Sequence, residues 1–330
     1  QEVTVGDERQ KVAITVEKQD AENGSTIAGA EFGLYAKEDI KAGGKVIVKA
    51  DEQLCTAVTG EDGTAIFEQN LPFGSYYIKE LQAPDGFVSS DEIIEVTVSY
   101  QGQDVEVVRL KEIFKNQPTT VEFRKSDLTT GVELDGATLT VLDKDGNEID
   151  KWTSVKGEPH IIKRLHVGET YILREEFAPY GYLKAEEVEF TITDTAEIQK
   201  VEMKDDVPIG RIIINKKGEF LSEVSWNDMV AGAMDSIWGY VTGSLKDVTF
   251  EIYAREDIKA ADGESDDYYK KDELVATIKT DELGIARTDD LPLGKYYVVE
   301  KETADGFVLD GEPRDIDLTY RDQDTPVVTF

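Results

Sequence analysis

One sequence pattern occurs three times along this 330-residue chain, and the repetition limits the possible folds more than any other feature. Its clearest element is an aromatic stretch that ends in glutamate and is followed by a turn. The three versions read LPFGSYYIKE at 71–80, VGETYILRE at 167–175 and LPLGKYYVVE at 291–300. A pattern that recurs at this spacing indicates tandem modules of about 100 residues, each large enough to bury its own core.

Two more elements precede the aromatic stretch in every copy. Each copy opens with a mostly alternating apolar and polar stretch that ends in lysine: VAITVEK at 12–18, VEFRK at 121–125 and IIINK at 212–216. A second apolar stretch then follows: AGAEFGLY at 28–35, DGATLTVL at 135–142 and KDVTFEIY at 246–253. Period-two alternation rich in Val, Ile, Thr, Tyr and Phe is typical of β-strands. We therefore predict an all-β chain in which each copy forms a sandwich of about seven short antiparallel strands, of immunoglobulin-like size.

The copies follow one another closely, with boundaries near Pro118 and Pro208. This predicts three domains, at 1–117, 118–207 and 208–330. At both boundaries the last strand of one copy runs almost directly into the first strand of the next. Such short connections predict a stiff, end-to-end rod and not domains on flexible linkers.

The third copy contains an insertion at about 219–244 that interrupts the strand pattern. Several of its apolar residues follow helical spacing, and Ser225 is a candidate N-cap, so we predict a helix of about three or four turns. The apolar residues are Trp226, Val230, Ala233, Met234, Ile237 and Val241. Their face would either pack on its own domain or form a docking surface for a neighbouring domain or a ligand, with Trp226 and Trp238 as the main contacts.

The composition argues against several classes of function. With 69 acidic and 36 basic residues the formal charge is −33, which disfavours nucleic acids and anionic membrane surfaces as partners. No run of about 18 apolar residues could span a membrane, and no signal peptide is visible, so we interpret the chain as a segment of its parent if that parent is secreted. One cysteine, Cys55, excludes an intrachain disulfide framework, and two histidines, His160 and His166, leave little basis for histidine catalysis. The acidic stretch 143–150 lacks the spacing of a calcium loop, and we expect neither a metal nor a cofactor.

The aromatic stretch, with its following Ala-Pro-x-Gly-Phe/Tyr turn at 83–87 and 178–182, resembles the collagen-adhesin B-type, or SpaA-type, domains of Gram-positive surface proteins and pilins. The resemblance covers nearly the whole chain as three tandem domains. It implies prealbumin-like sandwiches on the bacterial cell surface, anchored to the cell wall through parts of the parent outside this chain. In that family a lysine on the first strand bonds covalently to an asparagine or aspartate on the last strand, and a buried glutamate assists.

This resemblance assigns a cross-link to each of the first two copies. In the first copy the matching residues are Lys18, Glu80 and Asn116. In the second copy they are Lys125, Glu175 and Asp205. Alternation along the strands favours Asp205 over Asp206, and the alignment of the motif favours Glu175 over Glu176.

The third copy matches only in part. Lys216 and Glu300 occupy the lysine and glutamate positions, with Lys217 as a less favoured alternative. The last strand stops at Phe330, and if that residue corresponds to Phe114, the acceptor would lie two positions beyond it. We therefore expect no cross-link within this copy of the chain.

These features favour a structural stalk segment of a cell-surface adhesin or pilus-like protein, stabilised by isopeptide bonds that form without an enzyme. The alternative is a ligand-binding adhesin region that contacts a host extracellular-matrix protein or glycan through the insertion or an inter-domain groove. A turnover enzyme is disfavoured, because the sequence has no Gly-x-Ser-x-Gly elbow, phosphate loop or zinc-binding helix. We expect a monomer whose neighbours are adjacent domains of the same surface protein, with no nucleic acid and no membrane insertion.

Overall fold

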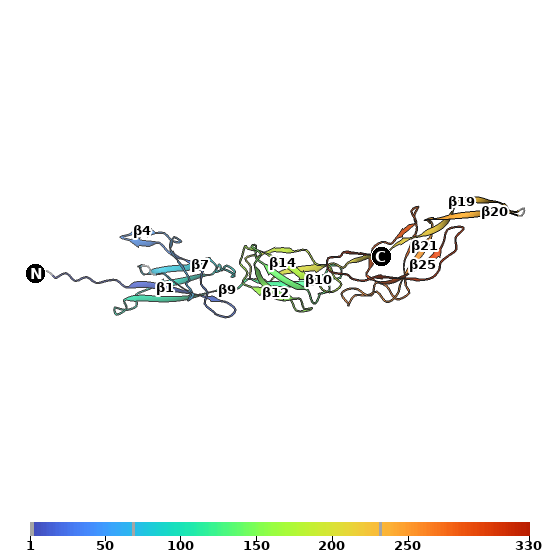
Figure 1. The fold of residues 1–330 in the computed structure, drawn as a ribbon. Coiled ribbons are helices and arrows are strands. Elements are labelled where there is room, and N and C mark those ends of the chain that lie inside the picture. Colours follow the sequence, from blue (N-terminus) through green and yellow to red (C-terminus); the bar gives the residue numbers. More distant parts are fainter. Residues whose placement is uncertain (1–2, 68–69, 231–232) are drawn as a thin grey trace.

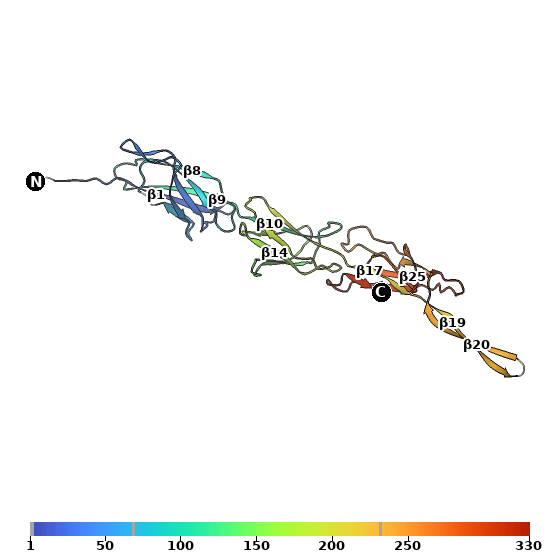
Figure 2. The same cartoon turned by 90° about the horizontal axis from the view of Figure 1, so that it is seen from above.

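The computed structural model describes residues 3–67, 70–230 and 233–330, and the secondary structure of these residues contains strands and no helix. Three sandwich-like bodies follow one another in a row (Figures 1 and 2). The N-terminus lies at one end of the row, and a long hairpin projects from the other. The prediction of an all-β chain is confirmed for this part of the sequence.

The first domain has two facing sheets, with strand orders β6-β1-β9 and β5-β2-β7-β8. Alternating residues of both sheets meet in a core that includes Ile14, Val16, Phe32, Ile78 and Phe114. A small hairpin of β3 and β4 is added to this body. The strands are β1 (Lys11–Asp20), β2 (Glu31–Ala36), β3 (Ile40–Ala42), β4 (Lys45–Val48), β5 (Gln53–Val58), β6 (Thr64–Phe67), β7 (Gly74–Gln82), β8 (Ile93–Val98) and β9 (Val107–Asn116).

The second domain repeats this arrangement without the extra hairpin. Its sheets have the orders β13-β10-β16 and β12-β11-β14-β15. Its core includes Val121, Phe123, Leu139, Leu173 and Met203. The strands are β10 (Thr120–Asp127), β11 (Thr138–Leu142), β12 (Glu148–Thr153), β13 (His160–Lys163), β14 (Thr170–Phe177), β15 (Val188–Thr191) and β16 (Gln199–Asp205).

The third domain divides its first sheet in two. The orders are β24-β17-β27 and β18-β23, and the facing sheet is β22-β21-β25-β26. Its core includes Ile212, Phe250, Tyr296 and Leu318. The strands are β17 (Ile209–Arg211), β18 (Ile213–Asn215), β21 (Thr249–Ala254), β22 (Leu274–Lys279), β23 (Ile285–Arg287), β24 (Leu291–Pro292), β25 (Gly294–Glu302), β26 (Arg314–Leu318) and β27 (Val327–Thr329).

The first and last strands of each domain pair in parallel, so the prediction of purely antiparallel strands was wrong. The pairs are β1 with β9, β10 with β16 and β17 with β27. An alternating pattern shows which face of a strand is buried, but it contains no information on the direction of the neighbouring strand. Because both strands of a pair run the same way, the chain enters each of the first two domains at one end and leaves it at the other.

The insertion of the third domain is a two-stranded hairpin, so the prediction of a helix was wrong. β19 (Lys217–Val230) pairs antiparallel with β20 (Ala233–Ser244), and Val224 lies opposite Trp238. The aromatic residues of the segment favour a strand. Gly239 and Gly243 disfavour a helix. In the hairpin the residues of the predicted helical face do not form one face: Ile237 lies opposite Ser225, so it is on the other face from Trp226. The side chains of 227–235, among them Val230, Ala233 and Met234, lie outside the described residues.

Direct contacts join the first domain to the second. Arg164 pairs with Asp20 at 2.6 Å, and Lys163 pairs with Glu22 at 2.7 Å. Gly86, at a φ of +78°, lies so close to Arg164 that an added Cβ would be 2.6 Å from the Arg164 carbonyl oxygen. These contacts support the stiff connection expected from the sequence, since a glycine is required where the two backbones meet.

Candidate functional site

Lys18 occupies a core position of β1. The strand buries Val12, Ile14 and Val16 on one side, and alternation places Lys18 next in this row with no exposed side-chain surface. Its Nζ lies 5.7 Å from the ring centroid of Phe32. Burial in these apolar surroundings penalises the ammonium form and lowers the pKa of Lys18. The lysine is thereby shifted toward the neutral amine, which is the nucleophilic form.

Asn116, the last residue of β9, lies beside this lysine. Lys18 is opposite Phe114 in the parallel pair, so Asn116, two residues later, is on the same face of the strand. Lys18 Nζ donates a hydrogen bond to Asn116 Oδ1. Glu80, from β7 of the facing sheet, completes the group: its Oε1 is 3.0 Å from Lys18 Nζ, and its Oε2 accepts a hydrogen bond of 2.8 Å from Asn116 Nδ2.

A β-bulge follows Glu80 in β7. Phe32 of β2 is opposite Glu80, whereas Glu31 is opposite Gln82, so one residue of β7 has no partner at this point. The same register shift occurs beside the glutamates of the other two domains. A bulge bends the strand and changes the direction of the chain next to a functional side chain. The following loop then places the Ser90 backbone N–H against Glu80 Oε2 at 3.0 Å.

The second domain has the same arrangement with an aspartate in place of the asparagine. The side chains of Lys125, Glu175 and Asp205 have no exposed surface. Lys125 Nζ lies 2.9 Å from Glu175 Oε1 and pairs with Asp205 Oδ1. Burial is the main cause that raises the pKa of Asp205 to about 7, and the neighbouring Glu175 adds to it. Asp205 therefore keeps its proton to a far higher pH than an aspartate in water.

Two backbone groups that support the glutamates were not identified from the sequence. They are the N–H groups of Ser90 and of Ala185, which donates to Glu175 Oε2 at 2.7 Å. Both follow the turn after the aromatic stretch, so the conserved spacing of that turn between the copies was the available signal. The less favoured alternatives lie elsewhere: Asp206 is exposed and accepts a hydrogen bond from its neighbour Val207.

The third domain brings together a lysine and a glutamate only. Lys216 Nζ is 2.5 Å from Glu300 Oε2, the lysine side chain is 22% exposed, and the alternative Lys217 is exposed. Glu300 Oε1 is buried and has no hydrogen-bond partner among the described residues. Compared with the first domain, this group has a more exposed lysine and no neighbouring Asn or Asp side chain from a last strand.

The register of β27 corrects the alignment of Phe330. Phe330 N donates to Arg211 O and Phe330 O accepts from Ile213 N, which places Phe330 opposite Ile212. The residue that holds this place in the first domain is Leu110, opposite Ile14, and not Phe114. Because Asn116 follows Leu110 by six positions, the equivalent acceptor position lies six residues after Phe330 and not two.

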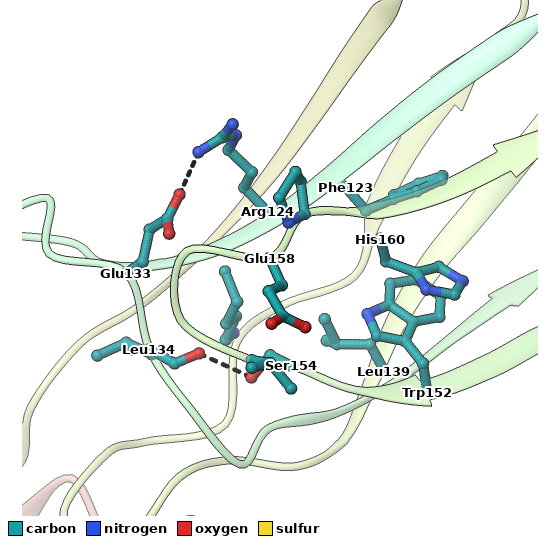
Figure 3. Close-up of a pocket in the computed structure, with 12 residues that line it drawn as sticks. Phe123, Arg124, Glu133, Leu134, Leu139, Trp152, Ser154, Glu158 and His160 are labelled. Carbon is teal, nitrogen blue, oxygen red and sulfur yellow. Dashed lines mark hydrogen bonds and ion pairs between the residues drawn. The ribbon is translucent and has the colours of Figure 1, made fainter.

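A small hollow lies beside Lys125 in the second domain (Figure 3). Trp152 and His160 stack at its edge with ring centroids 4.1 Å apart, and a His160 ring nitrogen is 2.7 Å from Asp150 Oδ2. At about 10 Å³ the hollow has room for roughly one water molecule. These contacts explain His160 as a packing residue at the edge of the sandwich.

Within residues 3–67, 70–230 and 233–330, no group of three or more His, Cys, Asp or Glu side chains is arranged to hold a metal ion. Over these ranges the structure also has no helix of the length and apolarity needed to cross a membrane. Cys55 is a half-buried free thiol.

A family model described as the SpaA prealbumin-like fold domain matches residues 12–112, 119–207 and 240–330. The chain belongs to the SpaA family. Its three SpaA domains each contain the aromatic stretch that ends in the buried glutamate. The third match begins after Lys216, so it includes Glu300 but not the lysine strand. No curated protein matches the sequence.

Several solved structures resemble this SpaA chain. The Bacillus anthracis TIE protein is 23% identical with a TM-score of 0.57; the match covers 97% of this chain and 50% of that one, so the chain spans about half the length of that structure. BcpA, the major pilin subunit of Bacillus cereus, is 17% identical over 97% of this chain and 98% of that one, with a TM-score of 0.44. The shaft pilin SpaA of Lactobacillus rhamnosus GG is 16% identical over 60% and 97%, with a TM-score of 0.28. The likeness to the TIE protein supports the assignment of the fold.

Proposed function

We propose that this chain is a structural stalk segment of a Gram-positive cell-surface adhesin or pilus-like protein, stabilised by isopeptide bonds that its domains form themselves. The bonds join Lys18 to Asn116 and Lys125 to Asp205. One observation supports the proposal most: two buried lysines each touch an acyl side chain and a glutamate where the first and last strands end. A buried lysine is costly to fold, and a chemical reaction is a physical reason to keep one there.

In the first domain the reaction begins with attack of the neutral Lys18 amine on Asn116 Cγ. The new C–N bond forms as the bond between Cγ and Nδ2 breaks, and Nδ2 leaves as ammonia. Glu80 contacts both nitrogens, so it can accept a proton from the lysine and pass one to the leaving group. General acid–base assistance of this kind contributes about 10²–10⁴-fold to the rate.

In the second domain the acceptor must be a protonated carboxylic acid, because a carboxylate resists attack by an amine. The raised pKa of Asp205 supplies this form near neutral pH. Lys125 then attacks Asp205 Cγ, a hydroxyl leaves, and with one proton from the amine it departs as water. Glu175 holds the place of Glu80 in this exchange.

Folding supplies the remaining acceleration, because the paired strands hold the reacting groups in contact before the reaction. Effective concentrations for well-oriented groups reach about 10⁵–10⁸ M. Each domain reacts once and consumes no external substrate. We therefore propose a chain that is not a turnover enzyme.

The parallel terminal strands explain how such bonds would serve a stalk. Tension enters the first domain at the start of β1 and leaves after β9, at the opposite end of the body. A bond between Lys18 and Asn116 passes this tension directly from β1 to the end of β9. Residues 19–115 are then outside the path of the force, and the strand hydrogen bonds do not have to resist it. This role suits a cell-surface location, with anchoring and any adjacent domains supplied by the parent protein.

The mass of the denatured, intact protein tests the proposal. We expect a deficit of one ammonia and one water relative to the sequence. Lys18→Ala should restore the ammonia alone and Lys125→Ala the water alone. A full sequence mass for the folded wild-type protein would refute the cross-links.

The exposed aromatic residues of the hairpin favour a second function, the binding of a host protein or glycan. Trp226 and Trp238 are 64% and 53% exposed and lie on one face of the paired strands, and Tyr240 extends this face. Exposed aromatic surface of this kind is typical of interaction sites. A variant in which a short glycine linker replaces the hairpin should lose adhesion to immobilised matrix proteins or glycans while keeping both cross-links. Unchanged adhesion would exclude this function for the hairpin.

A further inference from the structure

A cavity of about 380 Å³ lies in the joint between the second and third domains. Three tyrosines line it, Tyr180, Tyr268 and Tyr320, and most of its other lining residues are apolar, among them Pro208 and Pro292. We call this cavity the tyrosine groove. Its volume is within the range of about 300–1,000 Å³ that is usual for ligand sites.

The walls of the tyrosine groove are held in place by contacts between the domains. Tyr320 donates a hydrogen bond of 3.0 Å to Tyr182 O, and its ring meets that of Tyr180 edge-on with centroids 4.9 Å apart. Gln323 accepts a hydrogen bond of 2.8 Å from Ala178 N on the other side of the joint. Tyr180 is nevertheless 83% exposed and Tyr268 is 44% exposed. The joint therefore presents aromatic surface in a preformed arrangement, which reduces the entropy cost of binding.

The surroundings of the groove are acidic. Burial raises the pKa of Tyr268, and the nearby carboxylates of Asp127, Asp262 and Asp206 add to this shift. Asp322 and Asp324 act in the same way on Tyr320. The whole chain has a formal charge of −33. These charges favour a cationic ligand and disfavour phosphates, nucleic acids and acidic glycans.

The polar groups that line the groove indicate a peptide ligand and not a sugar. Besides the tyrosine hydroxyls, the polar side chains of the lining are those of Lys259 and Asp290. Asp290 forms an ion pair with Arg211, in which Oδ1 lies 2.6 Å from Nε. A glycan needs several convergent polar side chains to hold its hydroxyl groups, and this groove offers few. A polyproline II segment instead presents pyrrolidine rings for aromatic packing and unpaired carbonyl oxygens that tyrosine hydroxyls can bind.

We infer that the tyrosine groove binds an extended, proline-containing segment of a partner protein that has basic side chains beside the prolines. The prolines pack between the tyrosine rings, and the basic groups face the surrounding aspartates. This role goes beyond that of a stalk and does not depend on the isopeptide bonds.

Fluorescence anisotropy with a labelled peptide of Pro-Pro-Arg repeats tests the inference on the full chain. We expect saturable binding that weakens as salt increases, and weaker binding of the matched Ala-Ala-Arg and Pro-Pro-Glu peptides. Tyr180→Ser should reduce the affinity about tenfold or more, because it removes one aromatic wall. Tyr100→Ser is the matched control, since Tyr100 is an exposed tyrosine of the first domain that does not line the groove.

An unchanged thermal unfolding curve for Tyr180→Ser shows that its effect is local, as the exposure of this side chain predicts. If that curve shifts, protection of the joint from hydrogen exchange by the peptide in the wild-type chain supplies the same test. The inference is overturned by absence of peptide binding, by equal binding of the Ala-Ala-Arg peptide, or by a Tyr180→Ser variant that is intact and binds normally. Neutral oligosaccharides that bind in a Tyr180-dependent manner, in place of the peptide, would also overturn it.

Discussion

Replacing Glu80 by glutamine tests the proposed chemistry of the first domain most directly. Glutamine keeps the shape of the side chain, but it has no carboxyl group to move protons between Lys18 and Asn116, so we expect no bond to form. The bond would close a loop whose ends are 98 residues apart. By analogy with disulfides, the chain-entropy contribution of such a loop is about 4–5 kcal/mol. For a domain of this size that corresponds to a fall in Tm of roughly 20 °C.

Two assays on one sample measure this effect. Intact mass after denaturation reports the bond, and calorimetry reports the unfolding of the first domain. Glu95→Gln is the matched control, because Glu95 is an exposed residue of β8 that pairs with Lys37 at the surface, and surface pairs contribute about 0–1 kcal/mol. A Glu80→Gln protein that still loses ammonia would refute the role of Glu80. A protein that lacks the bond but unfolds at the wild-type temperature would refute the loop-closure argument.

Three further predictions follow from the same contacts. Asp205→Asn should still form the second cross-link but release ammonia in place of water, so the total mass deficit becomes two ammonias; a deficit unchanged from wild type contradicts the assignment of Asp205. Lys125→Met leaves Asp205 unlinked with a folded pKa above its unfolded value of about 3.9, so the folded state binds the extra proton. The contribution of this group to stability in urea should be greatest below about pH 4 and should fall as the pH rises from there to beyond 7, because the variant has lost Lys125, which lowers the pKa of Asp205 in the wild-type chain; a rise over that range would show that Asp205 is not the buried acid described here. Gly86→Ala should loosen the first junction, because its Cβ would meet the Arg164 backbone; small-angle scattering should then show a broader range of lengths, and an unchanged profile would argue against this contact.

Much of the site follows from local patterns. Alternation along β1 places Lys18 in line with Ile14 and Val16, so its burial can be read from a short stretch of sequence. The repetition of the lysine, the aromatic stretch and its final glutamate suggested that these residues act together. The structure brings Lys18, Glu80 and Asn116 into contact, and the bonds themselves stay a prediction.

The failures concern contacts between distant segments. The helical spacing in the insertion was a local count, whereas the hairpin exists because Val224 meets Trp238 across a turn. Likewise, neither the bulge after Glu80 nor the offset of Phe330 in the third domain can be inferred from one strand, because each is a property of a pair.

By itself, the sequence of this protein determined which side chains are buried, how often the module repeats and which reactive residues each module contains. Only the tertiary structure decided the parallel direction of the terminal strands, the hairpin of the insertion and the cavity between the second and third domains. The physical reason is that the burial of a strand residue depends on its own period-two position, which is local. Pairing, register and domain contacts depend on the free energy of packing against residues many positions away, and that becomes defined only when the whole chain is folded.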